Sequence, residues 1–212
     1  MNFTIFETLF ILAIDDEDGD LIESAVNDLE PALAAGVLAE LVLHNRIMLE
    51  DGWVTVVDPA AIEHPILDRA LFAMTDTARM RKVRYWINTL TYEQLRSEIA
   101  QHLVVNGVLV RKKKYLLLVV PYGESTNGQV SAKYALKSRL REIVLAGQPP
   151  EPAELIQLVL LNNCCLLGLV FTRGERKSAV KKIVKLSSEP EAGVALSGTL
   201  QDITAVVSRS LC

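Results

Sequence analysis

The sequence predicts a mainly helical protein, and three observations support this prediction. Apolar residues recur at helical spacing over most of the chain, beginning with Phe3, Phe6 and Phe10. Only two stretches carry the turn signals of short β-ribbons. Half of the 212 residues are hydrophobic and 23% are charged, a composition typical of a folded globular protein. We therefore expect a single helical domain over residues 1–212 with two small ribbons.

The helices can be placed from their apolar spacing and their end signals. Pro31 suits the first turn of a helix, and Asn106–Gly107 suits a helix end. In chain order, helices are expected over Phe3–Ile14, Asn27–Leu43, Pro65–Met74, Thr77–Leu90, Thr91–Val105, Gln129–Leu145, Glu154–Phe171, Glu175–Leu186 and Thr199–Leu211.

The longest apolar stretch, Leu155–Phe171, is expected to be a buried core helix. It contains Gln157, Asn162 and Asn163, and three amides would be costly at the centre of a bilayer. The apolar start of the chain lacks a basic segment, so we expect neither a signal peptide nor an anchor. Three cysteines cannot form a paired framework, which favours packing roles in a reducing compartment. The expected location is the cytoplasm.

A helix followed by a β-ribbon occurs twice, which predicts two winged-helix-like units. In the first unit, Asp51–Gly52 is a hairpin turn signal between two apolar strands. In the second, the helix at Thr91–Val105 is followed by a protruding hydrophobic β-hairpin that ends before Pro121. The polar segment Gly123–Gly128 is expected to be a loop.

Charge is distributed unevenly along the chain, although the formal net charge is only −4. Residues 1–78 contain 16 acidic and 2 basic side chains, whereas residues 79–141 contain 13 basic and 3 acidic ones. The basic block favours an anionic partner, either phospholipid or nucleic acid. The alternative is that the two blocks face each other within the fold.

No catalytic pattern is present, so we expect no enzyme and no cofactor. His44, His64 and His102 lie on separate elements without the spacing of a metal site. The acidic run Asp15–Asp20 lacks the glycine of a calcium loop, and we expect a solvated turn there. No nucleophile elbow, Walker loop or dinucleotide fingerprint occurs.

The second hairpin is the candidate functional site, because cations and apolar residues adjoin there. The cations are Arg111, Lys112, Lys113 and Lys114, and the apolar residues next to them are Tyr115, Leu116, Leu117 and Leu118. An exposed apolar tip flanked by lysines would suit membrane insertion, with the cations near anionic headgroups. A strand buried on both faces would give the same apolar run, and the residues alone leave both interpretations open.

Two other functions use the same features. A winged-helix protein would contact nucleic acid, but the helix at Asn27–Leu43 has no cation to face a phosphate backbone. We therefore do not expect a nucleic-acid partner. An interaction scaffold could use the apolar hairpin as a homo-oligomeric contact or bind another protein there.

The order of several short motifs resembles the Golgi phosphoprotein 3 family, which has bacterial as well as eukaryotic members. The resemblance covers most of residues 3–145 and is looser beyond. It is carried by Glu7, Leu9, Leu12, Asp16 and Gly19; by Leu38–Leu41, Arg46–Ile47 and Leu49–Glu50; by Leu67–Asp68 and Ala70–Leu71; by Trp86–Ile87 and Leu90; and by Leu103–Val104 and Gly107–Leu109. The short chain is similar to the bacterial members.

This resemblance implies a mainly helical domain with a hydrophobic hairpin, acting as a peripheral membrane protein. Eukaryotic members bind phosphatidylinositol 4-phosphate at the Golgi and recruit glycosyltransferase tails. The family's hairpin tip falls on Tyr115–Leu118. Of its headgroup pocket only Arg96 is kept, because the other positions fall on Ala25 or Val26, on Ala34 and on Glu93. The resemblance thus adds Arg96 to the expected lipid-binding residues, with the cations of Lys133–Arg141 assisting. A Golgi location would apply only to a eukaryotic member.

Overall fold

A computed structural model describes residues 3–15, 20–77, 79–91, 93–112, 115–118, 121–125 and 128–188, with only the backbone described for Glu93 and residues 110–131. The helices are α1 (Ile5–Ala13), α2 (Leu29–Leu43), α3 (Pro65–Asp76), α4 (Val83–Leu90), α5 (Glu93–Val105), α6 (Ala132–Leu145), α7 (Pro152–Asn163) and α8 (Arg176–Ser188), with short 3-10 helices η1 (Glu23–Ala25) and η2 (Leu166–Leu169). The chain is therefore mainly helical, as predicted. The expected helix at Thr199–Leu211 lies outside the described residues.

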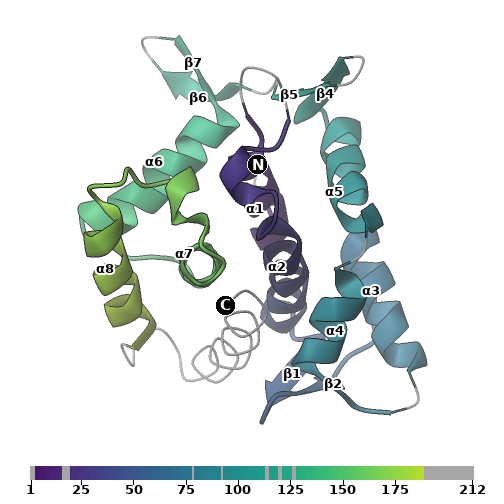
Figure 1. Ribbon diagram of the computed structural model, residues 1–212. Helices are drawn as coiled ribbons and strands as arrows, with labels where there is room; N and C mark the ends of the chain where they lie inside the picture. The colour runs from purple at the N-terminus through teal and green to yellow at the C-terminus, as the bar shows by residue number, and fades with distance from the viewer. Residues whose placement is uncertain are drawn as a thin grey trace.

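The strands form three small antiparallel sheets. They are β1 (Ile47–Glu50), β2 (Trp53–Val56) and β3 (Arg81–Lys82) in one sheet, β4 (Leu109–Lys112) with β5 (Tyr115–Leu118) in a second, and β6 (Pro121–Ser125) with β7 (Gly128–Ser131) in a third. In Figure 1 the β4–β5 and β6–β7 ribbons lie at one end of the molecule, and β1–β2 lies at the opposite end.

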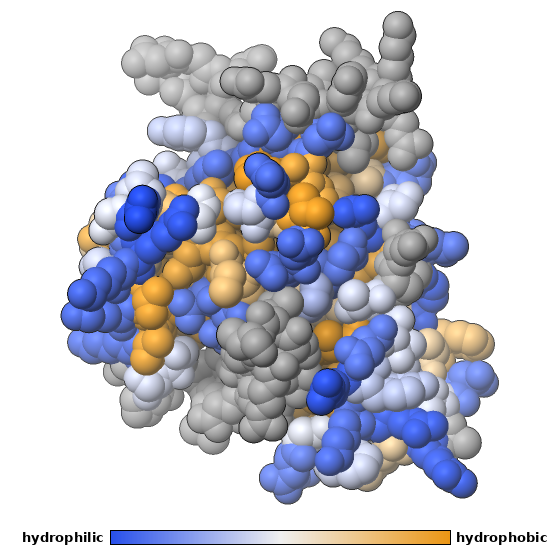
Figure 2. All heavy atoms as spheres, in the orientation of Figure 1, coloured by the Kyte–Doolittle hydropathy of each residue, from blue (hydrophilic) through white to orange (hydrophobic). Residues whose placement is uncertain are grey.

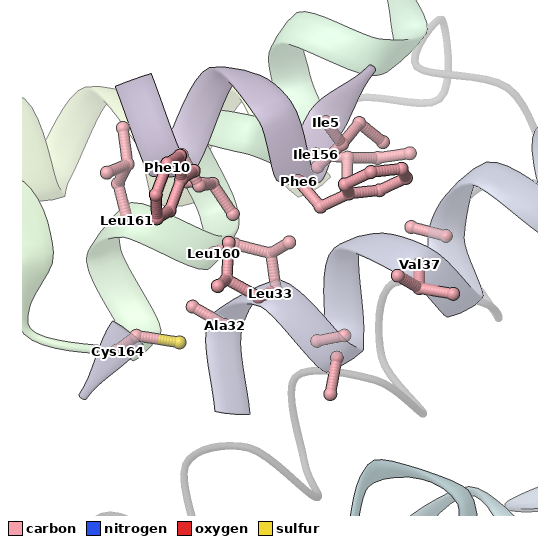
Figure 3. Packing of buried hydrophobic residues seen from close by; sticks show 14 of the residues in the cluster. Ile5, Phe6, Phe10, Ala32, Leu33, Val37, Ile156, Leu160, Leu161 and Cys164 are labelled. Carbon is pink, nitrogen blue, oxygen red and sulfur yellow. The ribbon is translucent and has the colours of Figure 1, made fainter. Parts of the chain in front are cut away.

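Helices α1 and α2 form the centre of the molecule, with α3–α5 on one side and α6–α8 on the other (Figure 1). Every residue of α1 is buried. Figure 3 shows Phe6 and Phe10 of α1 beside side chains of α2 and α7, among them Leu33 and Leu161. Buried apolar residues from α1 through α8 belong to one core cluster. Burial of the apolar surface of these residues contributes most of the free energy that stabilises the fold.

The close approach of α1 and α2 requires a glycine. A Cβ added at Gly36 would lie 3.1 Å from the Cβ and 3.2 Å from the Cα of Phe6. These atoms belong to a fully buried helix and cannot easily move. The α1–α2 contact therefore depends on the missing side chain at Gly36.

The first ribbon has the predicted turn. Asp51 and Gly52 both have positive φ angles, 52° and 75°, as a two-residue type I′ turn requires. The helix predicted over Thr77–Leu90 was wrong in its first part. Arg81 and Lys82 pair with β2 as a third strand, and α4 begins only at Val83.

Two other predicted elements differ from the structure. Within the segment expected to be a polar loop at Gly123–Gly128, the described residues 123–125 and 128 belong to the strands β6 and β7. The helix expected to continue to Phe171 ends at Asn163. Cys165 has a φ angle of 57°, and this left-handed conformation breaks the helix before η2. No helix within the described part of the chain has the length and apolarity needed to cross a bilayer.

Candidate functional site

The β4–β5 hairpin is present as predicted, but its turn lies among the cations. Antiparallel pairing brings Lys112 opposite Tyr115 and Leu109 opposite Leu118. The two connecting residues are therefore Lys113 and Lys114, which themselves lie outside the described residues. Tyr115–Leu118, expected at the hairpin tip, instead form the returning strand β5. Tyr115–Leu118 pair with Leu109–Lys112 at every position of the two strands.

The base of the hairpin is fixed in the core. Helix α5 buries Leu95, Ile99 and Leu103, and it ends at Val105, two residues before Gly107, which has a φ angle of 71°. Val108 and Leu109, the next residues, are also buried. The chain thus leaves a rigid helix through a left-handed turn, which fixes the direction in which the hairpin begins.

The positions of the implied headgroup pocket contain little positive charge. Ala25 and Ala34 are completely buried, and Val26 is 46% exposed. Arg96 of α5 lies 3.5 Å from Glu30 of α2, measured from Nε to Oε1. Burial raises the pKa of Glu30, and the positive charge of Arg96 partly offsets this rise. Arg96 is therefore already engaged by an acidic neighbour, and phosphate recognition needs several convergent cations.

The cations of α6 are also engaged within the fold. Lys133 is buried and donates a hydrogen bond to the carbonyl oxygen of Ile14. Arg139 donates two hydrogen bonds to Glu154, at 2.7 and 2.8 Å. Arg141 binds Glu175 in the same bidentate way, at 2.6 and 2.8 Å. The expectation that this helix offers its cations to a membrane was wrong for these three side chains, since they join α6 to α1, α7 and the start of α8.

The Arg141–Glu175 pair predicts a specific acid sensitivity. Hydrogen bonds from Arg141, with further bonds from Thr172, hold the pKa of Glu175 at about 2. The pKa of an unfolded glutamate is about 4.3, so the pair stabilises the fold above that pH and loses its effect as pH falls towards 2. A Glu175→Gln variant should be less stable than the parent at neutral pH, and the difference should shrink between about pH 4.5 and pH 2. Urea unfolding of both proteins at several pH values measures this difference in stability. A difference that stays constant between about pH 4.5 and pH 2 would contradict the prediction.

A cavity of about 450 Å³ lies between α1, α6 and α7. Its lining includes Phe3, Leu136 and Gln157 together with the Arg139–Glu154 pair. In the part of this face that the structure describes, Figure 2 shows mostly polar and charged side chains, with apolar ones gathered over α1 and its neighbours. Arg139 and Glu154 bind each other, and Glu151, which also lines the cavity, caps the start of α7 with its side chain.

Helix α2 cannot act as a DNA-reading helix. Its residues Ala32–Leu41 are all buried against neighbouring elements. A recognition helix must enter the major groove with one face exposed. The first helix–ribbon unit therefore has winged-helix order without an accessible reading helix.

One cluster in the fold was missed by the sequence prediction. His64 and His102 lie on separate elements, as expected, but the fold brings both side chains to Glu7 of α1. Burial alone would raise the pKa of Glu7, yet the neighbouring imidazole of His64 and hydrogen bonds from Thr4 lower it overall. Burial and the neighbouring His64 lower the pKa of His102. Sequence spacing could not reveal this cluster, because it depends on how α1, α3 and α5 pack.

Together these features define a class: a helical protein whose helix α5 leads into a ribbon that joins a basic strand end to an apolar returning strand. A sequence model of the Golgi phosphoprotein 3 (GPP34) family matches residues 5–203, nearly the whole chain. The chain belongs to the Golgi phosphoprotein 3 family.

Proposed function

We propose that this protein is a non-enzymatic peripheral membrane protein that binds anionic phospholipid through the β4–β5 hairpin. The observation that carries the proposal is the hairpin register, which joins the basic stretch Arg111–Lys114 to the apolar strand Tyr115–Leu118 at one end of the molecule. Cations close to an anionic leaflet contribute about 1 kcal/mol each. Membership of the Golgi phosphoprotein 3 family supports a lipid-binding role.

The register also suggests how the hairpin meets a bilayer. Because Lys112 pairs with Tyr115, two lysines connect the strands in the sequence, and inserting this connection first would carry charged groups to the deepest point, which is costly. The hairpin therefore lies along the interface, where its cations reach headgroups and its apolar residues reach the acyl boundary. Because Arg96 is the only cation at the four implied pocket positions and is paired with Glu30, binding depends on lipid charge more than on one headgroup.

Residues 1–212 are proposed to act as one domain, since the buried residues from α1 to α8 share one core cluster. The β4–β5 hairpin then moves with the helical body. A protein partner, or a second copy of the chain, could contact the same apolar strand when no membrane is present.

Vesicle co-sedimentation tests the proposal. The full-length protein should bind phosphatidylcholine vesicles that contain phosphatidylserine and should bind pure phosphatidylcholine poorly. Reversing two charges, Arg111→Glu with Lys112→Glu, should weaken binding at least about tenfold, since each cation contributes about 1 kcal/mol. Leu116→Asp with Leu117→Asp should also abolish binding, because charged groups are excluded from the acyl boundary.

A matched control is available on α3. Phe72 is 71% exposed and belongs to a different element, so Phe72→Asp should leave vesicle binding unchanged. The proposal fails if the Leu116/Leu117 variant sediments with anionic vesicles as well as the parent does. A salt-sensitive shift of duplex DNA that the charge reversal removes would instead favour nucleic-acid binding. A concentration-dependent dimer that the leucine variant dissociates would favour the scaffold.

A further inference from the structure

Glu7, His64 and His102 converge in the interior from three different elements. Glu7 lies on α1, His64 is the N-cap of α3, and His102 lies in the last turn of α5. Their potential ligand atoms all lie within 4.8 Å of one another. The two imidazole rings are 4.4 Å apart between centroids. Three elements far apart in sequence thus present two nitrogens and one oxygen to a common point.

The distances from Glu7 to the two histidines are close to the distances between neighbouring ligand atoms around a bound metal ion. Its Oε1 atom lies 3.6 Å from Nε2 of His64 and 3.4 Å from Nε2 of His102. These distances are long for hydrogen bonds. Ligands at 2.0–2.1 Å from a tetrahedral zinc ion are separated by about 3.3–3.4 Å. An ion could therefore bind Oε1 of Glu7 and either Nε2 atom at nearly the observed separations, and all three ligand atoms once the two imidazoles, which lie within 4.8 Å, move closer together.

The carboxylate is oriented for this role by the start of α1. The backbone N–H of Thr4 donates to Oε2 of Glu7 at 2.9 Å, which leaves Oε1 facing the imidazoles. Hydrogen bonds of this kind hold metal ligands in position from outside the shell. Both ring nitrogens of His64 are inaccessible to solvent and have no hydrogen-bond partner in the described part of the chain. A buried polar group without a partner is costly, and a metal ion would satisfy one of these nitrogens.

Asn106 is the one competitor for a ligand atom among these contacts. Its Nδ2 lies 2.9 Å from Nε2 of His102. Asn106 is exposed, so its side chain can rotate away without leaving a buried polar group unsatisfied.

We propose that Glu7, His64 and His102 bind a divalent transition-metal ion of the zinc class. Two imidazoles and one carboxylate suit zinc and its neighbours in the first transition row, and a water molecule would complete a four-coordinate shell. The role is structural, because the three side chains are largely buried and line neither the cavity between α1, α6 and α7 nor the pocket beside β2 and α3. The ion would join α1 to α3 and to the last turn of α5, where His102 lies seven residues before the first paired residue of the β4–β5 hairpin, Leu109.

Calorimetric titration with Zn²⁺ tests the proposal in protein without a histidine tag. The parent should carry Cys165→Ser and Cys212→Ser, so that neither of these thiols binds the metal; Cys164 is buried. We expect one ion per chain and a rise in Tm that a chelator reverses. Outer-shell changes typically weaken metal binding by about 10- to 100-fold. Loss of a ligand in His102→Gln should therefore weaken it by at least about 100-fold.

Two further variants make the outcome decisive. Glu7→Gln has nearly the same shape and should also lose zinc, with circular dichroism showing that the helices persist. His44→Gln removes the histidine outside the cluster and should bind zinc as the parent does. Bound Co²⁺ should show the visible absorption of a tetrahedral site in the parent and in His44→Gln only. Absence of zinc binding in the parent, or binding that survives both His102→Gln and Glu7→Gln, overturns the proposal.

Discussion

A Phe10→Ala variant is expected to lose about 3–5 kcal/mol of unfolding free energy, the usual cost of truncating a buried phenylalanine. Phe10 is 2% exposed and lies on α1 beside α7, with Leu161 next to it in Figure 3. The loss combines the transfer free energy of the ring with a cavity that the surrounding helices cannot close, because α1 is buried on all sides. Urea unfolding followed by circular dichroism measures it.

Phe72 provides the comparison for this prediction. It is 71% exposed on α3, so Phe72→Ala removes the same ring without opening a cavity. Its effect should lie within about 0.5 kcal/mol of zero, as for most surface substitutions. Equal losses at the two positions would show that α1 is not the centre of the core.

Glu40 is expected to be the polar residue of α2 on which stability depends most. Its side chain is 7% exposed, and Oε1 accepts a hydrogen bond from the backbone N–H of Ile5 at 2.5 Å. Ile5 is the first residue of α1, so this N–H has no acceptor within its own helix. Glu40→Leu should cost about 1.5–3 kcal/mol, the usual contribution of a buried hydrogen bond to a charged group.

A Glu40→Gln variant tests whether the hydrogen-bond acceptor or the negative charge of Glu40 stabilises the protein, because it keeps the acceptor and removes the charge. Burial raises the pKa of Glu40, which shows that the site disfavours a full negative charge. The amide keeps an oxygen for Ile5, so this variant should lose about 1 kcal/mol or less. Chemical denaturation of both variants at neutral pH makes the comparison. A Gln variant as unstable as the Leu variant would mean that the carboxylate charge at the start of α1, rather than the acceptor, is what matters.

Much of the fold could be predicted because local signals and burial agreed. Asp51–Gly52 predicted the first hairpin, since few other residue pairs adopt the two positive φ angles of its turn. The errors arose where pairing partners were distant. Arg81 and Lys82 form a strand only because Trp53 and Val54 lie beside them, and nothing in the local sequence at Thr77–Leu90 indicates that neighbour.

The candidate site was predicted less completely than the fold. The composition of Arg111–Leu118 predicted a basic and apolar hairpin, but only the register placed the turn at Lys113–Lys114. The sequence also suggested that Arg139 and Arg141 were available to a membrane. Their carboxylate partners, Glu154 and Glu175, are 15 and 34 residues away in the chain. Only the packing of α6 therefore shows that both arginines form ion pairs within the fold.

By itself the sequence determined the helical class, the two helix–ribbon units and the adjacency of cations and apolar residues in the second hairpin. Those features depend on interactions within a few residues, such as helical spacing, turn chemistry and strand alternation. The tertiary structure decided where the hairpin turns, which cations are already paired, and that Glu7, His64 and His102 meet. These depend on contacts between residues distant in sequence, which form only when α1, α3, α5 and α6 pack around one core.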